Sequence, residues 1–230
     1  AVRQLDHLEQ SKSCFNGHLE INWVYGFSGR SGKDNVNYLD SDREQIIYPA
    51  GSSVVILNRQ SNTQAVYSGH SSPVVSIAIH PNRKTVATAD TSGEIHVWYV
   101  RNRRSDPLSN AALEDTSRTT ILNSSPGQLS IQFNRNGTLL AVATNRNGNG
   151  VKTAADNKKT YIDLWDWSMK ERVVEPLYIN AESINDLAWA QDEDLLAVCG
   201  SKFLKFFTVE DSSSYGTRFL MDSGNAGKPK

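Results

Sequence analysis

The sequence predicts an all-β fold in which a strand-rich unit repeats about four times, the arrangement of a β-propeller. The first observation is a series of short apolar runs, each of which stops at Gly, Asn or Pro turn residues. The second is that these runs recur in the same order, at roughly the 40–45 residue spacing of a four-stranded propeller blade. Beyond about the first fifteen residues, no window sustains the i, i+3, i+4 apolar spacing of a helix.

The units follow one another along the chain with the same internal order. The second unit is the clearest, because Pro81-Asn82-Arg83 and the turn from Asp90 to Gly93 separate its apolar runs. The expected strands are 36–39, 45–48 and 54–57 in a weaker first unit, 74–80, 85–89 and 94–98 in the second, 130–133, 139–143 and 161–166 in the third, and 184–189, 195–199 and 203–207 in the fourth. The repetition itself therefore predicts the fold class.

Composition excludes several classes of protein. The 230 residues carry a formal net charge of −1, which argues against a dedicated nucleic-acid binder. No stretch approaches the roughly 20 apolar residues of a membrane span, so we expect neither nucleic acid nor membrane among the partners. The two cysteines, Cys14 and Cys199, form neither a disulfide framework nor a metal-binding spacing.

The sequence contains no pattern that indicates catalysis. The segment Gly29-Arg30-Ser31-Gly32-Lys33 resembles part of a phosphate-binding loop, but the full pattern needs Gly at 27 and Ser or Thr at 34. Phe27 and Asp34 stand at those positions, and an aspartate would repel a phosphate. No nucleophile elbow and no metal-ligand pair is present either. We therefore predict a protein that is not an enzyme, with no catalytic residue, no cofactor and no metal.

Short motifs resemble the WD-repeat family. Gly69-His70 before the second unit and Trp98 at its end are similar to the Gly-His to Trp-Asp frame of that family, and Trp165-Asp166 is a literal Trp-Asp in the third unit. In such repeats the histidine bonds a polar side chain on the middle strands. Ser92 stands at the turn position where we expect an aspartate, so we expect this bonded network to be incomplete in the second unit.

A narrower resemblance begins at residue 19. The block Trp23-Val24-Tyr25-Gly26 is similar to the HELP motif of the echinoderm microtubule-associated protein-like (EMAP-like) family. The segments that follow the motif in that family have counterparts here in the same order, namely Asn35 to Tyr38, Ile46 to Tyr48, Ser53 to Ile56, Asn62 to Gln64, Tyr67 to His70 and, much later, Ala197 to Phe207. The resemblance spans about residues 20–210.

The resemblance implies a non-enzymatic cytoskeletal protein that binds tubulin or microtubules. It also implies a location in the cytoplasm on the cytoskeleton, with a cilium or flagellum as one setting. The alternative is a general WD-repeat scaffold that joins other proteins in another complex. The alternating aromatics Trp23, Tyr25 and Phe27 are expected to bury themselves against the blade that follows rather than to bind a partner.

Two basic segments are candidate partner-binding loops. They contain Arg101, Arg103 and Arg104 after the second unit, and Arg146, Lys152, Lys158 and Lys159 in an insertion within the third. One interpretation is that both are solvated loops. The other is that their charges attract an acidic polymer such as the tubulin surface, with binding that weakens as salt rises.

The expected organisation has four parts. Residues 1–18 form a leader, 19–70 hold the HELP-like motif and a divergent first blade, 71–211 hold the WD-type blades with the insertion at 145–160, and 212–230 form a tail or the start of a missing part. A ring of about four blades would leave blade edges open, and soluble proteins avoid exposed edges. We therefore expect this chain to be part of a larger propeller.

Overall fold

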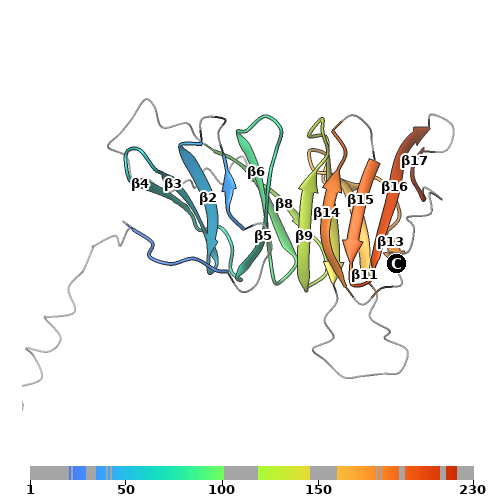
Figure 1. The fold of residues 1–230 in the computed structure, drawn as a ribbon, viewed down its shortest axis with the longest axis horizontal. Coiled ribbons are helices and arrows are strands. Elements are labelled where there is room, and N and C mark those ends of the chain that lie inside the picture. Colours follow the sequence, from blue (N-terminus) through green and yellow to red (C-terminus); the bar gives the residue numbers. More distant parts are fainter. Residues whose placement is uncertain are drawn as a thin grey trace, which may run out of the picture.

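The computed structural model describes residues 21, 23–29, 35–39, 41, 43–100, 119–145, 160–179, 181, 183–191, 195–212 and 216–221. These residues form four antiparallel sheets that follow one another along the chain, and we call them blades 1 to 4 (Figure 1). The all-β prediction is confirmed. Among the described residues, no helix has the length and apolar character needed to cross a membrane.

Blades 1 and 2 are regular meanders of four strands each, in which every strand pairs with the next along the chain. Blade 1 contains β1 (Asn37–Tyr38), β2 (Gln45–Ala50), β3 (Ser53–Asn58) and β4 (Thr63–Tyr67). Blade 2 contains β5 (Val74–Ile79), β6 (Thr85–Asp90), β7 (Glu94–Tyr99) and β8 (Thr120–Asn123).

Blades 3 and 4 follow the same order. Blade 3 contains β9 (Gln128–Phe133), β10 (Leu139–Asn145) and β11 (Thr160–Asp166), and both β12 (Glu171–Arg172) and β13 (Leu177–Ile179) pair with β11. Blade 4 contains β14 (Ile184–Trp189), β15 (Leu195–Gly200), β16 (Phe203–Ser212) and β17 (Gly216–Met221).

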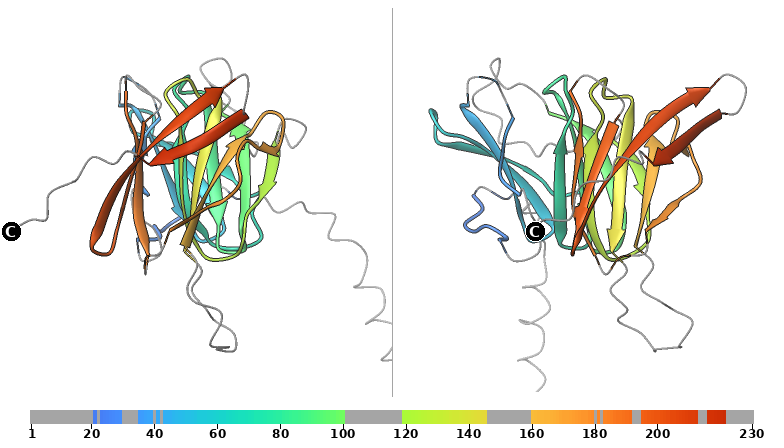
Figure 2. Two further views of the ribbon diagram at one scale, coloured as in Figure 1. Left: turned by 90° about the vertical axis from the view of Figure 1, so that its right-hand side faces the viewer. Right: turned by 45° about the vertical axis from the view of Figure 1, so that its right-hand side comes forward.

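The end of blade 4 differs from our expectation. We assigned residues 212–230 to a tail or to the start of a missing part, and the tail interpretation does not hold for β17, which pairs antiparallel with β16 from Phe207↔Met221 to Ser212↔Gly216. This pairing satisfies the backbone groups along one edge of β16, which an unstructured tail would leave without partners. Figure 2 shows the two strands together at the C-terminal end of the row of sheets.

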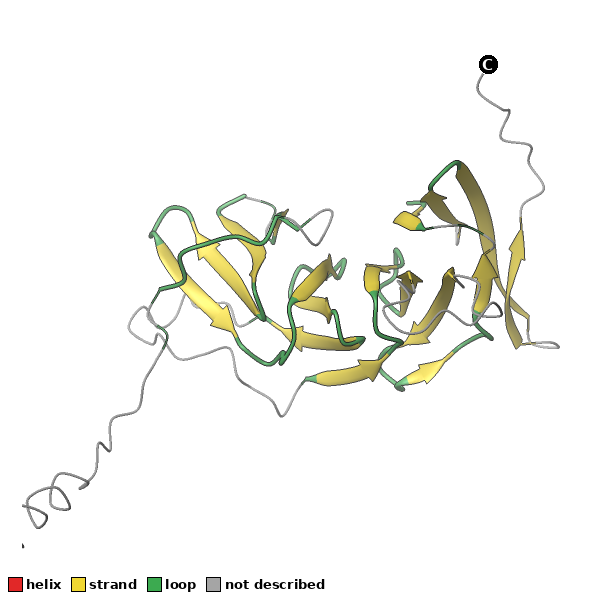
Figure 3. Cartoon of the chain, turned by 90° about the horizontal axis from the view of Figure 1, so that it is seen from below, coloured by secondary structure: helices red, strands yellow, loops and turns green. Residues whose placement is uncertain are grey.

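The core lies between the blades. Seen from below, the sheets stand side by side in an open arc (Figure 3). One apolar cluster joins blades 1 and 2 through Val54 and Val86, another joins blades 2 and 3 through Val97 and Phe133, and a third joins blades 3 and 4. Strand β6 is buried at all six positions because it has a neighbouring blade on each face. This geometry explains why its sequence, TVATAD, carries small and β-branched residues on both faces.

Antiparallel pairing divides the turns between two rims of the arc. The β1–β2, β3–β4, β5–β6 and β9–β10 turns lie on what we call the upper rim, at the top of Figure 1. The β2–β3 and β6–β7 turns lie on the lower rim, together with the ends of β10 and the start of β11. The sites described below are located by the rim on which they lie.

Candidate interaction surface

A buried chain of hydrogen bonds ties together the lower-rim end of blade 2. The Nδ1 atom of His70 lies 3.0 Å from Asp90 Oδ2, and its Nε2 atom lies 2.7 Å from Thr88 Oγ1. Trp98 Nε1 donates to the same Thr88 oxygen at 3.2 Å. Because a carboxylate can only accept, His70 donates through Nδ1 and accepts the Thr88 hydroxyl hydrogen at Nε2. The four side chains therefore form one directed network.

Aromatic rings extend this network toward blade 1. The Tyr67 ring stacks on Trp98 with 4.4 Å between centroids, and its hydroxyl lies 2.7 Å from His96 Nδ1. The His96 ring in turn stacks on His70 at 3.9 Å. A Cβ atom added at Gly69 would collide with the Tyr67 hydroxyl. The glycine of the Gly-His pair is thus required by the close approach of this tyrosine.

Burial sets the charge states within the network. The pKa of His70 falls to about 4, first because burial disfavours the charged ring and second because His96 lies against it. Burial alone would raise the pKa of the Asp90 carboxyl, but hydrogen bonds from Ser92, His70 and the Glu94 amide outweigh it and lower the pKa. At neutral pH, His70 is therefore a neutral ring beside the Asp90 carboxylate.

The expectation that this network is broken at Ser92 is wrong. The acid that bonds the histidine is Asp90, the last residue of β6, rather than a residue at the tip of the turn. Ser92 instead donates both its amide, at 2.9 Å, and its hydroxyl, at 2.5 Å, to Asp90 Oδ1. The residue type at the strand end, which sequence reasoning passed over, completes the network.

Three side chains of this region, His70, Glu94 and His96, each bring one potential metal-ligand atom within 4.8 Å of the others. Both nitrogens of His70, however, already bond Asp90 and Thr88. A metal would have to break the network to gain this ligand, and stacked rings do not direct their lone pairs at one point. The arrangement is explained by packing between blades 1 and 2.

Blade 3 keeps the strand frame of blade 2 but not the network. By strand register, Val142 stands where Thr88 stands in blade 2, and Thr144 stands where Asp90 does. Ser124 and Thr144 share a 3.1 Å hydrogen bond that replaces the His–Asp pair. With a valine in place of the threonine, the buried Nε1 of Trp165 has no hydrogen-bond partner.

A buried carboxylate adds a second unusual feature to blade 3. Asp163, which stands where His96 does in blade 2, is fully buried, and neither of its oxygens makes a hydrogen bond. Arg172 on β12 stacks over the Trp165 ring at 5.0 Å and brings its Nη2 within 3.4 Å of Asp163 Oδ2. Burial raises the pKa of the Asp163 carboxyl, and Arg172 opposes that shift.

The predicted Trp165-Asp166 pair divides into two roles. Trp165 packs in the apolar cluster between blades 2 and 3. Asp166 ends β11 on the upper rim, where its Oδ1 accepts hydrogen bonds from the Ser168 amide and hydroxyl and from the Met169 amide. It therefore stabilises the turn that follows the strand, and the Trp-Asp motif does not form a single unit.

The HELP-like residues lie along the face of blade 1 that points away from blade 2. The Val24 amide donates to Gln64 Oε1 at 2.9 Å, and the Gln64 side-chain amide donates back to the Val24 carbonyl at 3.3 Å. Trp23 is half-buried, and Gly26 has a φ of 131°, a conformation that favours glycine. This segment is attached to blade 1, as expected.

Burial of the aromatic stripe is only partial, so that expectation is wrong for two of its three residues. Tyr25 is 89% exposed and Phe27 is 55% exposed. Phe27 meets the Tyr48 ring edge-on at 6.2 Å, while Tyr25 contacts the Trp23 ring. The segment is extended, so its side chains alternate and only part of the stripe can face the sheet.

The candidate basic residues Arg101, Arg103, Arg104, Arg146, Lys152, Lys158 and Lys159 lie outside the described residues. Their points of attachment are nevertheless described. The first segment leaves β7 and enters β8 at the upper rim, whereas the second leaves β10 and enters β11 at the lower rim. The two segments are therefore attached to opposite rims.

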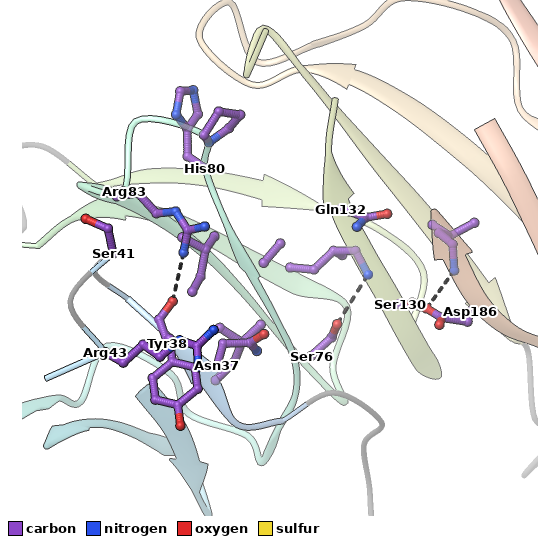
Figure 4. Close-up of a pocket in the computed structure, with 16 residues that line it drawn as sticks. Asn37, Tyr38, Ser41, Arg43, Ser76, His80, Arg83, Ser130, Gln132 and Asp186 are labelled. Carbon is purple, nitrogen blue, oxygen red and sulfur yellow. Dashed lines mark hydrogen bonds between the residues drawn. The ribbon is translucent and has the colours of Figure 1, made fainter. Parts of the chain in front are cut away.

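Sequence reasoning missed a cavity on the concave side of the arc. This cavity of about 710 Å³ is lined by the first strand of each blade and by upper-rim turns (Figure 4). Arg43 of blade 1 and Arg83 of blade 2 both contact Tyr38, and Asp186 belongs to blade 4. The only sequence signal was that both arginines fall in turns, which did not show that the turns converge.

The family model described as WD domain, G-beta repeat matches residues 61–99. That stretch runs from the β3–β4 turn to the end of β7 and contains the complete His70, Asp90, Thr88 and Trp98 network. Echinoderm microtubule-associated protein-like 1 of Rattus norvegicus is 26% identical over 206 residues, which are 90% of this chain and 24% of that protein. Echinoderm microtubule-associated protein-like 2 of Mus musculus is 23% identical over 198 residues, 86% of this chain and 29% of that protein.

The chain resembles the EMAP-like proteins and carries a WD repeat. The EMAP-like resemblance predicted from the sequence is thereby confirmed, and the chain spans about a quarter of the length of these curated relatives. The β-propeller domain of Cps50 (Swd1) from Myceliophteria thermophila superposes with a TM-score of 0.56 at 16% identity, over 76% of this chain and 53% of that one. This likeness supports the propeller fold alone.

Proposed function

We propose that this EMAP-like chain is a non-enzymatic WD-repeat module that binds tubulin or microtubules on the cytoskeleton. The observation that carries the proposal is the resemblance to EMAP-like proteins over about 90% of the chain. The buried polar network of blade 2 packs blades together, and its histidine is already bonded at both ring nitrogens.

The charge of the upper rim supports the same proposal. The described cations on this rim are Arg43, Arg59, Arg83, Lys84, Arg135, Lys170, Arg172 and Arg218, and the described acids are Glu44, Asp166, Glu171, Glu210 and Asp211. An excess of positive charge on one rim raises the rate at which an acidic polymer is captured and gives binding that depends on salt. Among the described residues, this rim therefore carries more cations than acids.

A general protein scaffold is the second candidate, and the aromatic segment favours it. Ile21, Tyr25 and Phe27 are each more than half exposed, along one stretch of chain. Exposed apolar side chains that lie close together mark protein-binding surfaces. Such a surface would serve a protein partner other than a charged polymer, with binding that is insensitive to salt.

Microtubule co-sedimentation over a salt series separates the two functions. We expect the full chain to pellet with microtubules at low salt, and the bound fraction to fall as salt rises. Microtubules whose acidic tails have been removed by limited proteolysis should bind less of the chain. Absence of pelleting at low salt, with the chain still soluble and folded, would contradict microtubule binding and favour the scaffold.

A further inference from the structure

Two arginines from neighbouring blades line the cavity on the concave side of the arc, which we call the axial cavity. Arg43 lies between β1 and β2, with its guanidinium carbon 5.6 Å from the centroid of the Tyr38 ring. Arg83 lies between β5 and β6, and its Nη1 donates to the Tyr38 carbonyl at 3.1 Å. Tyr38 therefore joins the two guanidiniums, which lie on one side of the cavity (Figure 4).

Both arginines hold a backbone conformation that is unfavourable for them. Their φ angles are 57° at Arg43 and 58° at Arg83, in the left-handed region that favours glycine. In blade 3 the position that matches Arg83 is Gly137, since the amide of each bonds the carbonyl three residues earlier, at His80 and at Asn134. Gly137 has a φ of 74°. Asn62, Lys170 and Lys202, which do not line the cavity, also have positive φ angles, so this conformation recurs in turns of the described residues.

The two guanidiniums have no carboxylate partner among the described residues. Arg83 bonds only a backbone carbonyl, and Arg43 contacts only the tyrosine ring through its side chain. The described acid that lines the cavity is Asp186, on blade 4, whose Oδ1 accepts the Leu187 amide at 2.8 Å. The observation that points to a ligand is therefore the meeting of two guanidiniums at Tyr38 on the wall of one cavity.

We propose that Arg43 and Arg83 form a carboxylate-binding site that receives a glutamate-rich, extended segment of a protein partner in the axial cavity. Arginine is suited to this role because its planar fork of donors matches a carboxylate and stays charged at every relevant pH. Ser76 and Ser130 on the neighbouring inner strands add polar groups along the cavity. This site is where an acidic partner such as tubulin would contact the chain. The inference rests on the proposed function only for the identity of that partner.

Glycine substitutions test the site without disturbing the fold. R43G/R83G removes both guanidiniums and places at each turn the residue type that Gly137 already provides in blade 3. R43Q/R83Q removes the charges but keeps side chains of similar length. The matched control, K84Q/K170Q, removes two positive charges from the same rim at residues that do not line the cavity. Thermal unfolding of all variants establishes that each remains folded.

The readout is fluorescence anisotropy of a labelled ten-residue glutamate peptide, with a glutamine peptide and inorganic phosphate as competitors. We expect the full chain to bind the glutamate peptide, and both arginine double variants to bind at least about tenfold more weakly. K84Q/K170Q should bind within about twofold of the unaltered chain. The glutamine peptide should not compete.

Any one of four results would overturn the inference. The first is that the glutamate peptide does not bind the full chain, and the second is that the arginine variants bind it as well as the unaltered chain does. The third is that K84Q/K170Q loses as much affinity as the arginine variants, which would show a diffuse charge effect. Competition by phosphate at lower concentration than by unlabelled glutamate peptide would also overturn it, in favour of a phosphate site. Because this assay contains no tubulin, its failure is distinguishable from a failure of the chain to pellet with microtubules.

Discussion

Blades 2 and 3 share a strand frame but stabilise it with different chemistry. Blade 2 ties its lower-rim end with a buried polar network in which Asp90, His70, Thr88 and Trp98 are each hydrogen-bonded to another member. Blade 3 replaces the network with a single Ser124–Thr144 bond and leaves Trp165 Nε1 without an acceptor. Apolar packing joins each blade to the next, whereas the polar network stabilises blade 2 in particular.

The largest expected difference between the two blades comes from removing the residue at the end of the second strand. Asp90→Ala should lower the free energy of unfolding by about 3 kcal/mol, because His70 and the Ser92 and Glu94 amides lose a buried acceptor. Thr144→Ala in blade 3 should cost only about 1 kcal/mol, since it removes one hydroxyl bond. Urea unfolding of both variants measures this. Equal losses would contradict the comparison.

Exchanging the residue in the middle of the second strand is the next test. Thr88→Val should cost about 2 kcal/mol, because His70 Nε2 and Trp98 Nε1 both lose their partner. The reverse change, Val142→Thr, should change the free energy of unfolding by less than about 1 kcal/mol, since the new hydroxyl offers Trp165 Nε1 an acceptor and offsets the lost apolar contacts. If Val142→Thr lowered the free energy of unfolding as much as Thr88→Val does, the proposed role of the threonine hydroxyl as acceptor for the tryptophan would be wrong. The same urea titration reports both.

The pH dependence of stability should come from blade 2. His70 has a folded pKa of about 4, below its ordinary value of 6.5, so the unfolded chain binds its proton more readily. Stability is therefore fully present above pH 6.5 and is lost as the pH falls from 6.5 toward 4. His96, whose pKa is also lowered, acts in the same direction. Thermal midpoints of the unaltered chain and of His70→Asn across this range measure the effect, and parallel curves would exclude His70 as its source.

Asp163 in blade 3 should show the opposite sign and a smaller effect. Burial raises its folded pKa, so its contribution to stability is present at low pH and is lost as the pH rises from the unfolded pKa through the folded one. Asp163→Asn removes the buried charge and should raise the free energy of unfolding at pH 7 by about 1 kcal/mol. Urea unfolding at pH 7 checks this. Destabilisation by the change would mean that the Arg172 contact at 3.4 Å outweighs the burial of the charge.

The sequence predicted the fold because the repeat pattern recurs locally in every blade. Alternation and turn residues placed the strands, and Gly69, His70 and Trp98 marked the network correctly. The position of the acid was missed because Asp90 and Ser92 are two residues apart around a tight turn, and only the fold shows which side chain faces His70.

The convergence of Arg43 and Arg83 on one cavity could not be predicted for a different reason. Arg43 and Arg83 are 40 positions apart, and their approach depends on how two blades pack rather than on any local pattern. The exposure of Tyr25 was missed because the sequence of alternating aromatic residues is the same whether a sheet covers all of them or only those on one side. Both errors concern contacts between separate segments of the chain.

The most direct test of the proposed microtubule binding is a quantitative binding measurement of the full chain at low salt. We expect a saturable pelleted fraction that falls as salt rises, and an Asp90→Ala protein, with blade 2 destabilised, that binds less at a temperature near its unfolding midpoint. A chain that is folded and soluble but stays in the supernatant at every microtubule concentration would contradict the account.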